Sequence, residues 1–209
     1  RNSRMKASYP GAMTTQPDYW NQLYRDEGRP GWDMDRATPL VSELLDLALP
    51  LGLRPGCELA VPGCGYGHDA AELAARGFAA TGLDFAPLAI QRALERYGTR
   101  AAWFQVDWFT TQLGPWDAIV DHTCFVAMDP DRRPAYVETC ARRLRPGGLW
   151  LGAFFHDVNG RSGPPHALTM AELRALAEPR FEVLHLAAAT ASHPRRAGRE
   201  FLLVARKRD

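Results

Sequence analysis

Three glycines at alternate positions, Gly63, Gly65 and Gly67, lie between an apolar run and a helix-like segment in ELAVPGCGYGHD. Glycine has no Cβ, so it tolerates unusual backbone angles and lets a ligand approach the main chain closely. The helix predicted to begin near Gly67 would point its unpaired N–H groups at the same place. Asp84 ends the next predicted strand, where a carboxylate can accept hydrogen bonds from both hydroxyls of a ribose. This pattern is typical of a site for a ribonucleotide-like cofactor.

The spacing of the glycines distinguishes between cofactors of this kind. The dinucleotide fingerprint is GxGxxG, but here His68 stands where that fingerprint has its third glycine. A GxGxG loop with an acid after the second strand resembles the site of class I methyltransferases, which bind S-adenosylmethionine and therefore no pyrophosphate. Asp107, after the third predicted strand, would accept from the adenine amino group, and the N–H of Trp108 would bond a ring nitrogen. An NAD-linked oxidoreductase is the alternative that His68 disfavours.

Strand-like and helix-like segments alternate from residue 57 onward. Strands are expected at 57–63, 78–84, 101–107, 116–122, 149–155, 181–189 and 199–207, and helices at 68–77, 86–98, 169–178 and from Asp129 to the glycines at 147–148. The alternation predicts an α/β, Rossmann-like fold with a seven-stranded, mostly parallel sheet and helices on both faces. A loop, not a helix, joins the last two strands, which predicts an antiparallel C-terminal hairpin at the edge. Before residue 57 we expect a helix from Asp18, a turn at 28–31 and a helix from about Thr38.

Composition limits the classes of function. The chain has 209 residues with a formal charge of +1, which gives no general attraction to nucleic acid or anionic lipid. Its four cysteines form no CxxC pair and match no zinc pattern. No apolar run approaches the 18 or so residues of a membrane span. We therefore expect a cytoplasmic, monomeric protein without a metal. Residues 1–12 are expected to be a disordered or added tail, and residues 13–209 a single domain.

The chain resembles the thiopurine S-methyltransferase superfamily, and most of all its plant-type thiol/halide methyltransferase branch. The resemblance runs from about Tyr19 to the C-terminal region. It is carried by GWDMDRATPLV (31–41), LAVPGCGYGHD (59–69), GLDFAPLAI (82–90), FQVDWF (104–109), WDAIVDHTCFVAMDPDRRPAY (116–136), LRPGG (144–148) and GPPH (163–166). It implies methyl transfer from S-adenosylmethionine to a small acceptor by direct displacement, with S-adenosylhomocysteine as the product.

The resemblance also implies roles for individual residues. N-terminal aromatic residues, in a lid at about 13–50, would close over the cofactor, and residues 1–30 are expected to order when it binds. Tyr24 stands where the branch usually has tryptophan, and His122 where it commonly has tyrosine, a departure that weakens the inference of a halide acceptor. The residues that match cofactor-contacting positions are Trp20, Tyr24, Trp32, Gly63, Gly65, Asp84, Phe85, Asp107, Trp108 and His122.

The acceptor is expected to be a small soft nucleophile, most of all a thiol. His122 would act as a base or only position the reactants, while Phe125, Phe155 and Arg161 would line the acceptor pocket. His68 is expected to cap a helix, and Cys64 is not expected to be a nucleophile. O- or N-methylation of a small metabolite is the alternative reaction. A non-catalytic module that binds the cofactor is the alternative of another class.

Overall fold

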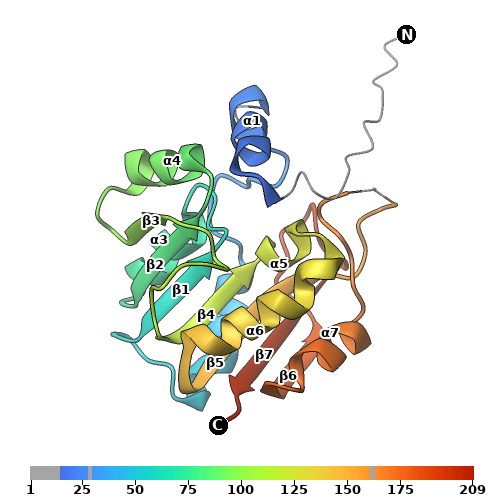
Figure 1. The fold of residues 1–209 in the computed structure, drawn as a ribbon. Helices are drawn as coiled ribbons and strands as arrows, with labels where there is room; N and C mark the ends of the chain where they lie inside the picture. The colour runs from blue at the N-terminus through green and yellow to red at the C-terminus, as the bar shows by residue number, and fades with distance from the viewer. Residues whose placement is uncertain (1–14, 28–29, 161–162) are drawn as a thin grey trace.

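The computed structural model describes residues 15–27, 30–160 and 163–209, so the predicted tail at 1–12 lies outside the described residues. Seven strands form one sheet in the order β3-β2-β1-β4-β5-β7-β6 (Figure 1). The strands are β1 (Glu58–Pro62), β2 (Ala79–Asp84), β3 (Ala102–Gln105), β4 (Trp116–His122), β5 (Leu144–Phe155), β6 (Phe181–Ala188) and β7 (Glu200–Lys207). β7 runs antiparallel to both β5 and β6, and the other pairings are parallel. The predicted fold class is therefore confirmed, including the C-terminal hairpin.

Helices cover both faces of the sheet. They are α1 (Pro17–Glu27), α2 (Leu40–Ala48), α3 (His68–Ala75), α4 (Pro87–Tyr97), α5 (Cys124–Ala127), α6 (Arg133–Arg143) and α7 (Met170–Ala177), with 3-10 turns η2 (Leu49–Leu51) and η3 (Pro130–Arg132). One core joins α5, α6 and α7 to the sheet, and a second core joins α2 and α3 to its other face. Figure 1 shows α6 and α7 side by side across the front of the sheet, with α1 above it.

The two cores follow from the alternation of side chains along the central strands. In β4, Ile119 belongs to the α6 core while Ala118 and Val120 belong to the α2 core. In β5, Trp150 and Leu151 divide between the two cores in the same way. Because successive side chains of a strand point to opposite faces, a strand buried on both faces must be apolar throughout.

The structure differs from the predicted elements near the LRPGG stretch. β5 begins at Leu144, five residues before the predicted start, because the stretch that ends α6 also pairs with β4. Leu144 lies opposite Trp116, but the next pair is Ala118 with Leu149, so the intervening residues form an irregular bulge. The helix predicted from Asp129 is divided into η3 and α6, and the short helix α5 was not predicted.

Gly67 has a different role from the other two glycines of the loop. It adopts a left-handed backbone with φ of 82°, and a Cβ there would lie 2.6 Å from the Trp103 indole. A Cβ on Gly82, in β2, would lie equally close to the same ring. The indole is held in place by a 2.8 Å hydrogen bond from its Nε1 to the carbonyl of Gly98. Gly67 therefore makes room for a tryptophan behind the loop.

The N-terminal helix is attached to the helix that follows β2. The side chain of Asn21 accepts a 3.1 Å hydrogen bond from the N–H of Leu88, at the first turn of α4. Tyr24 packs with Ala86 and Ala89 in a small third core. These contacts place α1 over the end of the sheet where β1 and β2 finish (Figure 1). Among the helices of the described residues, none is long and apolar enough to span a membrane.

Replacing Gly67 with alanine should destabilise the protein more than the same change at Gly147. Both residues have positive φ, but a Cβ on Gly147 would meet nothing within 4 Å. Gly147→Ala should cost about 1 kcal/mol from backbone strain, and Gly67→Ala about 2 kcal/mol or more because it also displaces the indole. Urea unfolding of both variants, alone and with Trp103→Leu, measures the difference. A Cβ on Gly67 would also lie 2.9 Å from that of Ala93, so part of the excess should remain in Trp103→Leu; an excess that does not shrink there would contradict this explanation.

Candidate functional site

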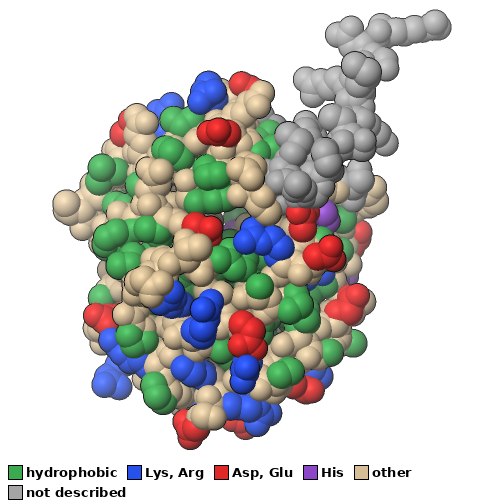
Figure 2. Space-filling view, viewed as in Figure 1, with side chains coloured by type: hydrophobic (Ala, Val, Ile, Leu, Met, Phe, Trp, Pro, Cys, Tyr) green, Lys and Arg blue, Asp and Glu red, His purple; other side chains and the backbone are tan. Residues whose placement is uncertain are grey.

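A cavity of about 710 Å³ lies at the carboxyl ends of the parallel strands, beneath α1. In Figure 2 the surface is hollowed below α1, with hydrophobic and basic side chains at the rim. In an open α/β sheet this edge is where ligands bind, because the strand order reverses there. The loops after β1, β2, β3, β4 and β5 all contribute to its wall, together with α1 and the loop between β6 and β7.

The glycine loop and the acid of β2 form one wall. Gly63 and Gly65 have positive φ values of 58° and 54°, and both line the cavity with Asp84 and Phe85. A Cβ on Gly63 would lie 2.7 Å from the sulfur of Cys124, so this position also lets the loop approach the start of α5. The predicted loop residues Gly63, Gly65, Asp84 and Phe85 are therefore brought together at the cavity.

The Asp84 carboxylate is fixed by the main chain. One oxygen accepts from the N–H of Gly65 at 3.0 Å and the other from the N–H of Ala86 at 2.9 Å. Burial raises the pKa of Asp84 to about 6, against the opposing effect of these N–H groups. Each oxygen keeps a lone pair for a ligand in the cavity, and the carboxylate is ionised at neutral pH.

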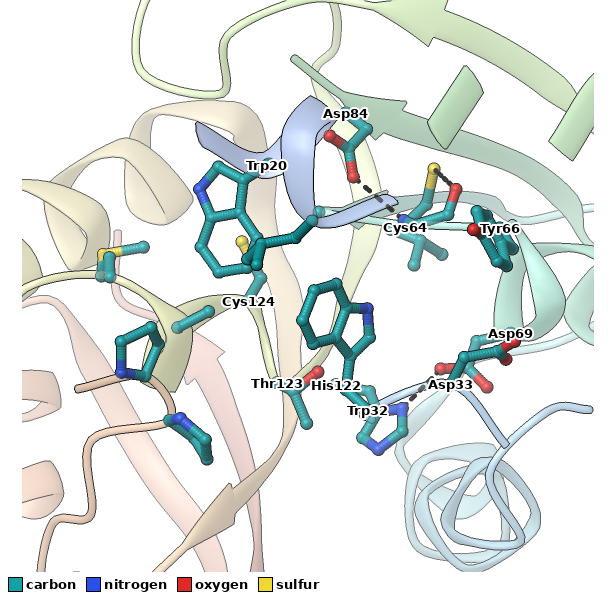
Figure 3. A pocket seen from close by; sticks show the side chains of 18 of the residues that line it. Trp20, Trp32, Asp33, Cys64, Tyr66, Asp69, Asp84, His122, Thr123 and Cys124 are labelled. Atoms are coloured by element: carbon teal, nitrogen blue, oxygen red, sulfur yellow. Dashed lines mark hydrogen bonds and ion pairs between the residues drawn. The ribbon is translucent and has the colours of Figure 1, made fainter. Parts of the chain in front are cut away.

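Three predicted aromatic residues form the roof of the cavity. The rings of Trp20 and Trp32 lie 5.6 Å apart in an edge-to-face arrangement, and the Tyr24 ring lies 5.6 Å from Trp32. Tyr24 also lies 5.1 Å from the ring of Tyr66 in the glycine loop. Figure 3 shows the two indoles beside the cavity, with Cys64 and Asp84 on the opposite side. The roof thus presents ring faces and edges and no charged group from these residues.

The end of β3 agrees with the prediction only in part. Trp108 lines the cavity, as do Val106 and Phe109. Asp107 is absent from the part of the wall that the structure describes. Its carboxylate accepts the N–H of Phe109 at 2.9 Å and so stabilises a local turn. A contact between Asp107 and an adenine stays a prediction.

His122, at the end of β4, has a partner at each of its two ring nitrogens. Figure 3 shows its contact with Asp69. Its Nδ1 lies 2.7 Å from a carboxylate oxygen of Asp69, and its Nε2 lies 2.7 Å from a guanidinium nitrogen of Arg196. A guanidinium only donates, so Nε2 accepts and the hydrogen is assigned to Nδ1, which donates to Asp69. In this arrangement both ring nitrogens are therefore occupied, and neither has a free lone pair for another proton.

Asp69 links this site to the N-terminal segment. Its second oxygen accepts the N–H of Thr38 at 2.8 Å. Burial raises the pKa of Asp69, but the interactions with His122 and with the Thr38 N–H outweigh it and hold the pKa below its usual value. Asp69 thus remains a carboxylate, although it is partly buried, because it has two donors.

Sequence reasoning missed Arg196. It lies between the two C-terminal strands in HPRRAGRE, a stretch with no motif, and it reaches the cavity only because the hairpin folds over the end of the sheet. The expectation for His68 was wrong, since its ring bonds the hydroxyl of Tyr97 at 2.6 Å and the carboxylate of Asp33 at 2.9 Å and caps no helix.

The structure places the residues of the predicted acceptor pocket in different surroundings. Phe155 lines the cavity. Phe125 does not, because it is fully buried and packs against Tyr136, Trp150 and Phe154. The short helix α5, which sequence reasoning did not predict, turns Phe125 into the core. Arg161 lies outside the described residues.

The cysteines and acids of the wall do not form a further reactive centre. Burial raises the pKa of the Cys64 and Cys124 thiols well above their usual value, with Asp84 adding to the effect, so neither is a thiolate at neutral pH. Ligand atoms of Asp33, Asp35 and His68 lie within 4.8 Å of one another. These groups are already paired, His68 with Asp33 and Asp35 with Arg96 at 2.6 Å.

Comparison with known proteins identifies the family. The profile of the family described as thiopurine S-methyltransferase matches residues 15–205. Thiocyanate methyltransferase 1 of Arabidopsis thaliana is 31% identical over 199 residues, which cover 90% of this chain and 84% of that protein. The 2-heptyl-1-hydroxyquinolin-4(1H)-one methyltransferase of Mycobacteroides abscessus is 30% identical over 177 residues, which cover 76% and 74%.

A solved structure shares the fold. The 1,6-didemethyltoxoflavin-N1-methyltransferase of Burkholderia thailandensis, with 1,6-didemethyltoxoflavin and S-adenosylhomocysteine bound, superposes with a TM-score of 0.72 at 19% identity. The match covers 100% of this chain and 94% of that one. At this identity the likeness is one of fold.

Replacing Asp69 with asparagine should destabilise the protein by about 2–3 kcal/mol at pH 7, because the amide would turn a donor toward one of the two donors that the carboxylate accepts. The difference from the wild type should shrink at low pH. A carboxyl with a lowered pKa contributes stability above its unfolded value and loses it as pH falls through the folded value. Glu72→Gln, an exposed change on the same helix, should cost under about 0.5 kcal/mol. Urea unfolding at pH 7 and near pH 3 measures both, and a constant difference would contradict the assignment.

Proposed function

The chain belongs to the thiopurine S-methyltransferase family, and on that premise we propose that it methylates a small thiol, which reacts as its thiolate. Members of the family are methyltransferases that use S-adenosylmethionine, and this chain is one of them. The observation that carries the choice of acceptor is the engagement of both ring nitrogens of His122.

The residues of the cavity fit S-adenosylmethionine. The carboxylate of Asp84 has lone pairs for the two ribose hydroxyls, and the glycine loop offers main chain with no side chain at Gly65. Trp108 and Phe109, after β3, supply apolar surface where an adenine would lie. The bound cofactor supplies an activated methyl group on a sulfonium.

The aromatic roof suits a cationic ligand. Trp20 and Trp32 line the cavity with Tyr24 and Tyr66, and the face of a tryptophan attracts a cation by about 0.5–2 kcal/mol. The rings also exclude water, which strengthens electrostatic interactions within the site and prevents hydrolysis. In our proposal this roof positions the sulfonium and places the acceptor in line with it.

A thiolate needs no base on the enzyme. Its lone pair forms the new S–C bond as the methyl carbon separates from the donor sulfur, which keeps the bonding pair. A neutral hydroxyl or amine would have to lose a proton, and His122 has no free nitrogen to take it. Basic side chains at the cavity, Arg132, Arg195 and Arg199 besides Arg196, favour an acceptor that arrives as an anion.

An acidic hydroxyl on an aromatic ring is the second candidate acceptor. The quinolinone named for the relative from Mycobacteroides abscessus is larger than thiocyanate. The cavity has room and ring surface for such an acceptor, with Phe109 under the guanidinium of Arg132 at 3.9 Å and Phe155 beyond it. Such a hydroxyl would also react as its anion, so it too would need no base on the enzyme.

Binding of S-adenosylhomocysteine should depend on the ionisation of Asp84. Because ribose hydroxyls require the carboxylate, the dissociation constant should rise about tenfold for each pH unit below about 6, the raised pKa of Asp84. Asp84→Asn should bind weakly, without this dependence. Asp121, whose pKa burial also raises to about 6, does not line the cavity, so Asp121→Asn is the matched control and should keep the dependence. Calorimetry from pH 5 to 8 measures the dissociation constants. Loss of their pH dependence in Asp121→Asn alone would contradict the role of Asp84.

The pH dependence of turnover should follow the thiol and not the enzyme. With aryl and alkyl thiols whose pKa values run from about 6 to about 10, the pH at which kcat/KM levels off should move with the thiol, because only the thiolate reacts. A midpoint common to every thiol would instead indicate a base on the protein. Turnover of neutral phenols and amines in the absence of any thiol turnover would show that the proposed acceptor is wrong.

A further inference from the structure

Arg196 connects more parts of the site than its place in the chain suggests. Its guanidinium donates to Nε2 of His122 at 2.7 Å and, through its other terminal nitrogen, to the carbonyl of Trp32 at 2.9 Å. It is paired with the buried carboxylate of Glu200 at 3.3 Å, and it lies 5.3 Å from the centre of the Phe155 ring. Only 8% of the residue is exposed.

The surroundings of Arg196 oppose its movement. Burial lowers the pKa of the guanidinium, while Glu200 raises it, so the cation is kept in place by its partners and not by water. A continuous line of contacts runs from an acid through an imidazole and a cation to a second acid; its members are Asp69, His122, Arg196 and Glu200. Loss of any bond in this line would leave a buried polar group unpaired.

The contact with Trp32 extends this line to the roof of the cavity. The Trp32 ring packs against Trp20 and Tyr24, so its carbonyl is attached to the aromatic roof. The neighbouring Arg195 donates to the carbonyl of Asp33 at 3.3 Å. The loop between β6 and β7 therefore holds the segment after α1 from the side opposite to α4.

We propose that Arg196 is a positioning residue that couples closure of the aromatic roof to the orientation of His122. When the roof is closed, the Trp32 carbonyl accepts from one terminal nitrogen of the guanidinium. The other terminal nitrogen donates to Nε2 of His122 and so favours the tautomer with its hydrogen on Nδ1. When the roof opens, Arg196 loses the Trp32 carbonyl as a partner. Nε2 of His122 is then no longer fixed as a hydrogen-bond acceptor. This proposal rests on the proposed function, because the roof is taken to close over the methyl donor.

The test uses two variants. Arg196→Met keeps much of the side-chain length but loses every hydrogen-bond donor, and Arg196→Lys keeps the positive charge with a single donating nitrogen. Arg174→Met, at an exposed ion pair on α7, is the control. In Arg196→Met we expect binding of S-adenosylhomocysteine to weaken at least tenfold and the ligand to protect Arg25 and Arg36 less from trypsin. Arg196→Lys should recover part of both effects, and Arg174→Met should match the wild type.

A spectroscopic measurement separates positioning from a merely structural role. In ¹⁵N–¹H spectra, with His122 assigned by His122→Gln, the wild-type ring should show the neutral Nδ1–H tautomer at pH 7. In Arg196→Met, Nε2 loses its donor and should take up a proton from solvent, while the Nδ1 hydrogen stays bonded to Asp69. Because Arg196→Lys is the milder change, it provides the same readout if Arg196→Met does not fold.

The proposal is overturned if both variants bind S-adenosylhomocysteine and protect the N-terminal segment like the wild type, or if the His122 signals do not change. None of these measurements uses an acceptor. A wild type that binds S-adenosylhomocysteine but methylates no thiol would therefore contradict the proposed function and leave the role of Arg196 standing.

Discussion

The partly buried carboxylate of Asp69 holds together three segments that are far apart in the sequence. It stands in the first turn of α3, accepts the N–H of Thr38 from the segment before α2, and accepts the Nδ1 hydrogen of His122 at the end of β4. A buried acid is costly unless its oxygens are satisfied, so each of these bonds stabilises the others. Through His122 the constraint reaches Arg196 and the C-terminal hairpin.

The two sides of the cavity differ in the interactions that stabilise them. The side under α1 is aromatic, with rings in edge-to-face contact, and it carries the Asp84 carboxylate, which main-chain donors hold in place. The side under the C-terminal hairpin is a line of charged and polar groups with fixed donor and acceptor roles. Trp32 belongs to both, because its ring packs in the roof and its carbonyl accepts from Arg196.

This division bears on the choice of acceptor. The family uses one donor with acceptors of different chemistry, and the relatives named above are described for thiocyanate and for a hydroxyquinolinone. In this chain the residue at the end of β4 is a histidine whose nitrogens are both occupied, and this is the basis of our proposal that the acceptor is already an anion. In that proposal, proximity, exclusion of water and an activated methyl group provide the acceleration.

The sequence by itself determined the order of the strands and helices, the glycine loop with Asp84, and the family. These features depend on local patterns: alternation in the strands, glycines where side chains do not fit, and an acid at a strand end. The boundary of β5 was missed because LRPGG both ends a helix and pairs as a bulged strand, and the role of Gly67 was missed because Trp103 comes from another strand. Only the tertiary structure placed Phe125 in the core, bonded His68 to Asp33, and brought Arg196 to His122 across 74 positions. Hydrogen bonds between residues so far apart are set by how the sheet and its loops pack, and no local pattern in the chain encodes them.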